Sequence, residues 1–358
     1  MARTNSLPDR LFAVILAGLL TGCTGLQYAN EPAAVATRPA VPAPKAAVLD
    51  RALEDRILAL DPDRVTPQDI RDTLAKAPAP RIILLHGGVF PVHLAMTSFA
   101  QFLIAMGYPE ARIRHPGGDE RWSHSPYEPS ERVAGMVAWF YEHEGVRPMM
   151  VGHSQGGMQA IKVLHDLAGT FAPSLPVWNP VTERPEPRTS IADPITGRDL
   201  PVVGNKVSYT SAVGAGGPSG VLPNQWSVIT RIREIPDTTI QFDGFFIGID
   251  WFAMTFTEAG VPRFASTSGK VEVRNIVLPA GYLHVSVPTT HHLPGNPKFR
   301  EFLDTYRPTG ERPDESTMPG SYSDNVLYAA ENWFMIKRHW VLEAQRFVRA
   351  RRGLVAPD

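Results

Sequence analysis

The fold is decided by the stretch MMVGHSQGGM, residues Met149–Met158. It predicts an apolar strand, a sharp turn with Ser154 at its tip, and the start of a helix. Gly152 and Gly156 stand two residues on either side of this serine, where a side chain would collide with the neighbouring backbone. The spacing G-x-S-x-G is typical of a nucleophile elbow, a strained strand-to-helix turn that holds a serine hydroxyl clear of the sheet.

A second motif lies upstream. Arg81-Ile82-Ile83-Leu84-Leu85 predicts a buried strand, and His86-Gly87-Gly88 follows it at once. With these two motifs, in this order, the chain resembles the α/β-hydrolase family over about residues 81–302. The resemblance implies a mostly parallel central sheet with helices on both faces, and an oxyanion hole made by the backbone N–H groups of Gly88 and Gln155. The alternative is a glycine turn that carries an ordinary surface serine.

A carboxylate is expected to orient the base of such a site. In the family the chain order is serine, acid, histidine, so the acid should follow the predicted strand 238–242. Asp250 is our first candidate, because it follows Gly248 and precedes an apparent helix. Asp243 is the alternative, although the glycine next to it is equally typical of a plain turn.

A histidine must take the proton of the serine, because an alcohol is a poor nucleophile at neutral pH. Residues 271–278 alternate as a last core strand should, and the family places its histidine in the loop that follows. His284 is our first candidate, because it lies a short distance beyond this strand. His291 and His292 are alternatives that a longer loop could bring to Ser154.

The N-terminus predicts a signal peptide. Arg3 and Arg10 precede the apolar run 11–20, which is too short to span a bilayer and leads into Leu20-Thr21-Gly22-Cys23. This ending resembles a bacterial lipoprotein signal, so we expect residues 1–22 to be removed and Cys23 to carry a lipid anchor. The protein would then be held on a membrane of the cell envelope, with its catalytic domain outside the cytoplasm. An ordinary secretory signal is the alternative.

The remaining chain predicts one large domain with extensions. Residues 23–47 are rich in Ala and Pro and should form a tether. Residues 48–310 should form the α/β domain, with a Pro-rich cap insertion around 173–206 that restricts access to the serine. Residues 311–358 should form a helical extension, whose helix at about 324–349 has one apolar face.

Periodicity also predicts the minor elements between these landmarks. The segments expected to be helical are 95–106, 130–144, 156–168 and 224–233, and those expected to be strands are 112–114 and 207–211.

The composition is that of an ordinary globular protein. Hydrophobic residues make up 43% of the 358 residues, charged residues 20%, and the net charge is −1. Since there is no basic stripe, we expect no nucleic-acid partner. The single cysteine excludes an internal disulfide. The loop 115–124 contains histidines and carboxylates but no paired-ligand spacing, so we expect neither a metal nor a cofactor.

Together these features predict a membrane-anchored serine hydrolase that cleaves carboxylic esters, esterase-like or lipase-like, through an acyl-enzyme on Ser154. Its substrate would be a small-molecule or lipid ester. Two alternatives are open. One is an acyltransferase, in which an acceptor other than water resolves the acyl-enzyme, and the other is a non-catalytic lipoprotein that uses the fold as a binding module.

Overall fold

The structure is a computed structural model that describes residues 49–354, apart from residues 89, 118–120, 217–222 and 257–262. The predicted signal peptide and the whole predicted tether, including Cys23, lie outside the described residues. Within those residues, no helix combines the length and the apolar character that crossing a membrane would require.

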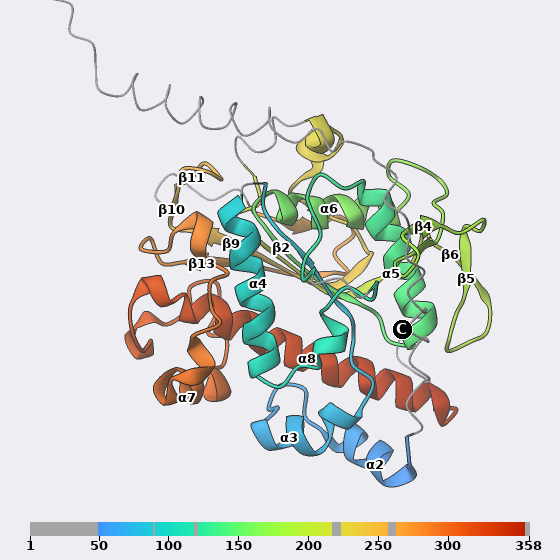
Figure 1. The fold of residues 1–358 in the computed structure, drawn as a ribbon, viewed down its shortest axis with the longest axis horizontal. Coiled ribbons are helices and arrows are strands. Elements are labelled where there is room, and N and C mark those ends of the chain that lie inside the picture. The colour runs from blue at the N-terminus through green and yellow to red at the C-terminus, as the bar shows by residue number, and fades with distance from the viewer. Residues whose placement is uncertain (1–48, 89, 118–120, 217–222, 257–262, 355–358) are drawn as a thin grey trace, which may run out of the picture. The chain divides into compact units, whose positions relative to one another are not determined.

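A five-stranded parallel sheet forms the centre of the described body (Figure 1). Each strand pairs in parallel with its neighbours. In order across the sheet the strands are β1 (Ile82–Leu85), β2 (Met149–His153), β7 (Val207–Val213), β9 (Thr239–Ile247) and β13 (Glu272–Leu278). The first three are buried along their whole length, as parallel strands are when helices cover both faces. The predicted α/β class and parallel sheet are confirmed.

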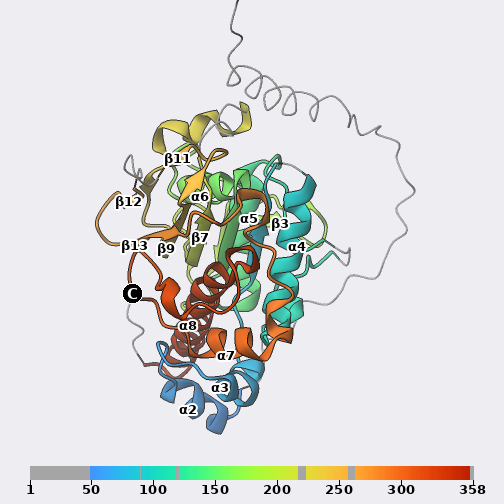
Figure 2. The ribbon, with the colours of Figure 1, turned by 90° about the vertical axis from the view of Figure 1, so that its left-hand side faces the viewer.

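Successive strand residues feed two apolar cores, because side chains alternate between the faces of a sheet. On one face Ile82 and Leu84 belong to a core with helices α4 (Phe90–Ala105) and α8 (Val326–Arg351). On the other face Ile83 and Leu85 belong to a core with α5 (Ser130–Glu144) and α6 (Gln155–Leu167). The helix predicted near the C-terminus is therefore part of the main core, and Figure 2 shows it beside α7 (Pro297–Thr305).

Two short helices at the N-terminal side start at conventional caps. The side chain of Asp50 accepts from the backbone of α2 (Arg51–Ala59), and Thr66 forms a capping box with Asp69 at α3 (Pro67–Asp72). Leu53 and Ile57 of α2 pack against the end of α8.

The remaining elements are short. The 3-10 helices are η1 (Leu74–Lys76), η2 (Glu110–Arg112), η4 (Pro223–Arg231), η6 (His284–Ser286), η7 (Leu293–Gly295), η8 (Glu315–Thr317) and η9 (Tyr322–Asp324). The two-stranded ribbons pair β3 (Trp178–Asn179) with β4 (Arg184–Pro185), β5 (Ser190–Ala192) with β6 (Asp199–Pro201), β8 (Glu234–Ile235) with β12 (Ala265–Ser266), and β10 (Ile249–Asp250) with β11 (Thr255–Phe256).

Two local predictions were wrong. The strand expected at 112–114 is the end of η2, where Arg112 turns inward to pair with Glu144 at 2.5 Å. The apparent helix after Asp250 is the hairpin β10–β11. The segment 224–233 is helical as expected, in the form of the 3-10 helix η4.

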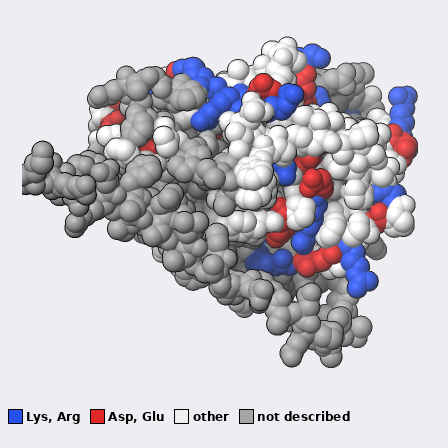
Figure 3. Space-filling view, turned by 90° about the horizontal axis from the view of Figure 1, so that it is seen from above, with Lys and Arg blue, Asp and Glu red and all other residues white. Residues whose placement is uncertain are grey.

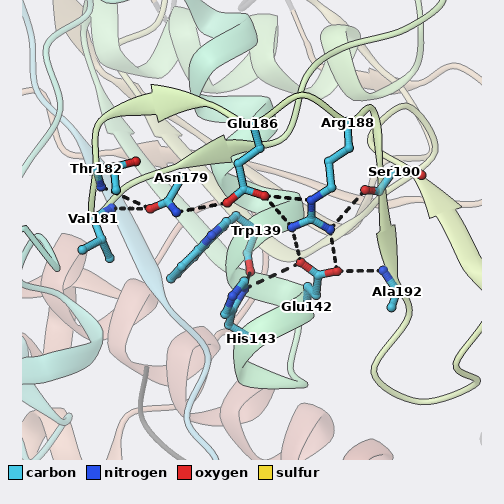
Figure 4. Close-up of polar contacts among 10 residues, drawn as sticks. All are labelled: Trp139, Glu142, His143, Asn179, Val181, Thr182, Glu186, Arg188, Ser190 and Ala192. Atoms are coloured by element: carbon cyan, nitrogen blue, oxygen red, sulfur yellow. Dashed lines mark hydrogen bonds and ion pairs between the residues drawn. The ribbon is translucent and has the colours of Figure 1, made fainter. Parts of the chain in front are cut away.

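The Pro-rich segment 173–206 lies along α5 (Figure 1). Its Arg188 donates hydrogen bonds to Glu142 of α5 and to its own neighbour Glu186, and Glu142 also accepts from the backbone N–H of Ala192 (Figure 4). Ile191 is buried in the core beneath. These contacts hold the segment against α5, and its action as a cap over Ser154 stays a prediction.

Candidate active site

Ser154 lies between the last residue of β2 and the first residue of α6. Its φ of 57° and ψ of −123° place a non-glycine residue at positive φ. The flanking glycines permit this turn: a Cβ on Gly152 would come 2.4 Å from the carbonyl oxygen of Gly156, and a Cβ on Gly156 would come 2.1 Å from that of Leu85. The sequence thus folds into the tight strand–turn–helix that its glycines predict.

His284 and Asp250 meet Ser154 in a chain of hydrogen bonds. The Nε2 atom of His284 lies 2.9 Å from Ser154 Oγ, and its Nδ1 atom lies 2.7 Å from Asp250 Oδ2. Asp250 Oδ1 accepts from the backbone N–H groups of Phe252 and Ala253, each at 2.9 Å. Because a carboxylate only accepts, Nδ1 carries the proton and Nε2 is left to accept from the serine hydroxyl.

All of these groups lie at the carboxyl ends of the strands. The glycine loop follows β1, Ser154 follows β2, Asp250 follows β9 and His284 follows β13. This is the edge at which parallel α/β sheets bind their ligands. Gly214, which follows β7, has a φ of +63°, and a Cβ there would come 2.7 Å from the His284 ring. A glycine is therefore required both by the turn and by the imidazole beside it.

His153 is a site residue that the sequence reasoning missed. Its Nε2–H donates to the backbone carbonyl oxygen of His284 at 2.7 Å, and its side chain is completely buried. Burial holds the pKa of His153 well below its usual range, so the ring is neutral. The signal that could have found it is a histidine that ends a buried strand directly before the nucleophile.

The structure places Gly88 next to the side chain of Gln155, and the backbone N–H groups of these two residues are the predicted oxyanion donors. A Cβ on Gly88 would come 1.9 Å from the side-chain oxygen of Gln155, and a Cβ on Gly87 would come 3.0 Å from the Cβ of Ser154. Tyr127 donates its hydroxyl to the carbonyl oxygen of Gly88 at 3.1 Å. As the first residue of α6, Gln155 also places a backbone N–H at a helix N-terminus, where negative charge is favoured.

The alternative acid and bases contact other groups. Asp243 lies in the middle of β9, where it accepts from Tyr209 at 3.0 Å and lies 3.5 Å from Arg274. The ring of His291 is hydrogen-bonded to Ser98. His292 lies 3.5 Å from Asp324. Of the three histidines weighed from the sequence, His284 is the one that the structure joins to Ser154.

Metal ligands do not gather in the described part of the chain: no group of three or more His, Cys, Asp or Glu residues there could hold a metal ion.

Comparison with protein-family models and with curated protein sequences finds no match to this chain. Its function must therefore be inferred from the fold and from the geometry around Ser154.

Proposed function

We propose that the chain is a serine hydrolase with an α/β-hydrolase fold, which cleaves carboxylic esters through an acyl-enzyme on Ser154. The observation that carries this proposal is the chain of two hydrogen bonds from Ser154 through His284 to Asp250, at 2.9 and 2.7 Å. Three separate loops supply these side chains in the order serine, acid, histidine. Backbone strain of the kind seen at Ser154 costs on the order of 1–3 kcal/mol and is typical of functional sites.

The geometry supports a two-step acyl transfer. Ser154 Oγ attacks the ester carbonyl carbon while its proton passes to Nε2 of His284, and Asp250 stabilises the imidazolium that forms. The N–H groups of Gly88 and Gln155 donate to the oxyanion. When the tetrahedral intermediate collapses, the C–O bond to the alcohol breaks and Nε2 returns the proton to the leaving oxygen. Water then repeats the sequence on the acyl-enzyme and releases the acid.

The location is proposed from the sequence alone. Cleavage before Cys23 and lipid on its sulfur would anchor the enzyme to a membrane of the cell envelope. Metabolic labelling with a palmitate analogue tests this: equal labelling of the wild type and a Cys23→Ala variant would exclude the anchor.

A fluorophosphonate probe tests the enzyme assignment. It should label the wild type on Ser154 and should not label Ser154→Ala. His284→Ala should lower kcat on p-nitrophenyl butyrate by on the order of 10⁴–10⁶, because the serine then lacks its base. His292→Ala is the matched control, a histidine in the same region with a different partner, and should behave as the wild type.

The two other functions would appear as distinct results. A folded wild type that neither labels nor hydrolyses any ester would favour the non-catalytic binding module. Labelling of Ser154, with acyl transfer to an added alcohol that far exceeds hydrolysis, would favour the acyltransferase.

A further inference from the structure

Large apolar side chains are exposed around the candidate site. We call them the rim, and each exposes at least half of its surface, from 50% for Phe252 to 73% for Trp251. The rim consists of Tyr127, Ile249, Trp251, Phe252, Met254 and Leu283.

The rim flanks both halves of the site. On the side of the base, the Phe252 ring stacks on the ring of His284, with centroids 5.1 Å apart and planes 24° apart. Leu283 directly precedes that histidine, and the hairpin β10–β11 that carries Asp250 carries four of the rim residues. On the oxyanion side, Tyr127 is hydrogen-bonded to Gly88. Rim side chains thus contact the site on both sides, at the candidate base and at the predicted oxyanion hole.

Most of the segments that carry the site and the rim contain few charged residues; the exception is the segment of Tyr127, where Glu128 follows the rim residue and lies 3.6 Å from Arg132. There is no Lys, Arg, Asp or Glu in residues 86–109 or 275–297, although these residue types make up 20% of the chain. In the hairpin residues 249–256 the single charged residue is Asp250, which is buried and bonded to His284. Figure 3 looks from above onto the molecule, and among the residues it colours the two signs of charge lie close together, with no large area of either.

One cation lies behind the hairpin and has to be considered. The guanidinium of Arg233 lies over the rings of Phe246 and Phe264, at 5.2 and 4.5 Å from their centroids. Both rings are buried in the core, but burial lowers the pKa of Arg233 to about 10, so the aromatic faces offset only part of the cost of desolvating its charge. The guanidinium also lies close to the loop after β7: its Nη2 atom would lie 3.0 Å from a Cβ on Gly216, two residues after Gly214. An anionic substrate is the alternative that this cation raises.

A large apolar patch exposed to water on a protein surface often marks a binding site. A charged group that left water to lie on the rim would lose hydration, and the charged side chains of these segments, Asp250 and Glu128, already have partners, so its transfer is unfavourable. An apolar chain placed there would instead remove its own surface and that of the rim from water.

We propose that the rim binds the apolar chain of an uncharged ester, so that the substrate class of Ser154 is neutral esters with a chain of several methylene groups. The inference rests on the proposed esterase function and adds the chemistry of its substrate.

A matched ester series tests the substrate class. The full chain with Cys23→Ala, which removes the predicted lipid site, is assayed on p-nitrophenyl acetate, butyrate, hexanoate and octanoate below their aggregation concentrations. We expect kcat/KM to rise about two- to fourfold per methylene, the gain for a partly to fully buried CH₂. A carboxylate or a trimethylammonium group at the end of the hexanoate chain should lower kcat/KM at least about tenfold. No dependence on chain length, or a preference for the carboxylate ester, would overturn the proposal.

Rim variants test where the chain binds. Trp251→Ser and Met254→Ser should each lower the ratio of kcat/KM for octanoate to kcat/KM for acetate. The double variant should lower this ratio by about tenfold. Leu354→Ser is the matched control, because Leu354 is also a large apolar side chain with half of its surface exposed but does not belong to the rim. It should leave the ratio unchanged. An unchanged ratio in the rim variants would overturn the proposal. So would a change from dimer to monomer in size-exclusion chromatography, because the rim would then be a contact between copies.

Fluorophosphonate labelling of every variant separates the two levels of failure. If Ser154 labels and esters are hydrolysed without the chain preference, the substrate class is wrong and the proposed function stands. If no protein labels and no ester is hydrolysed, the proposed function fails and the substrate class fails with it.

Discussion

His153 and Ser154 are neighbours in the chain, and both contact the same histidine. The hydroxyl of Ser154 bonds to the ring of His284, whereas the ring of His153 donates to the main-chain carbonyl of His284. Two consecutive residues at the end of β2 therefore hold both the ring and the backbone of the candidate base His284. Since burial lowers the pKa of His153, its ring adds no positive charge beside the imidazolium that the proposed mechanism forms.

His153→Phe should lower kcat about 10- to 100-fold with little change in KM, because a buried carbonyl left without its donor costs about 1–3 kcal/mol and releases the loop of His284. His153→Gln should recover part of the loss, since its amide can donate. Steady-state kinetics and the melting temperature are measured together. The control is His165→Phe, which removes a similar donor to the Glu234 carbonyl at the other end of α6. Equal losses of kcat in the two Phe variants would contradict a positioning role for His153.

At the scale of elements, strong periodicity predicted the core correctly. The helix expected at 130–144 is α5 with the same bounds, and the strands expected at the two motifs and at 271–278 are β1, β2 and β13. Such segments are predictable because each buries a continuous apolar face whatever its partners are.

The failures occurred where a distant partner decides the local structure. Arg112-Ile113-Arg114 alternates like a strand, but Glu144 on α5 draws Arg112 inward. Asp243 looked like the end of a strand, yet β9 continues through it because Tyr209 and Arg274 supply buried partners. No local pattern contains that information.

The candidate site shows the same division. Ser154 is indicated by a local motif, and the order of its partners comes from the family resemblance, which is why the segments that meet at Ser154 could be named from the sequence. The choice among three histidines depends on the glycine at 214, which admits the ring, and on the bond from His153, which holds the loop. Both are contacts between segments far apart in the chain.

At the scale of the whole molecule, a buried polar cluster joins the sheet to the last helix. Arg274 of β13 lies 3.5 Å from Asp243 of β9 and 2.5 Å from Glu331 of α8. Tyr209 donates to Asp243, and Tyr306 donates to Glu331. Burial is the main cause that raises the pKa of Asp243, to about 7, against the opposing effect of Arg274.

This raised pKa predicts a decline of stability between about pH 4 and pH 7. Below pH 4 the carboxyl of Asp243 is protonated in both the folded and the unfolded chain, and its contribution is fully present. As the pH rises the unfolded chain releases the proton first, so the free energy of unfolding falls, by at most about 1.4 kcal/mol per pH unit. Above about pH 7 this contribution is lost and the slope ends.

Asp243→Asn should therefore flatten the fall in the free energy of unfolding over this range, as measured by urea denaturation at several pH values. The exposed Asp199→Asn is the control and should keep the wild-type slope. An Asp243→Asn protein with the wild-type slope would show that another group is responsible. The groups that face Asp243 are Tyr209, Arg274, Glu331 and Glu272.

Helix α8 completes the main core from the very end of the chain. Its Trp333 and Trp340 are completely buried, in the core that also contains β1 and β2. In the chain α8 (Val326–Arg351) follows all five strands of the sheet, so during synthesis α4 is the only one of the two helices α4 and α8 that can cover this face until α8 is made. The strands alone therefore cannot complete this core, and native packing on this face can form only after α8 has left the ribosome.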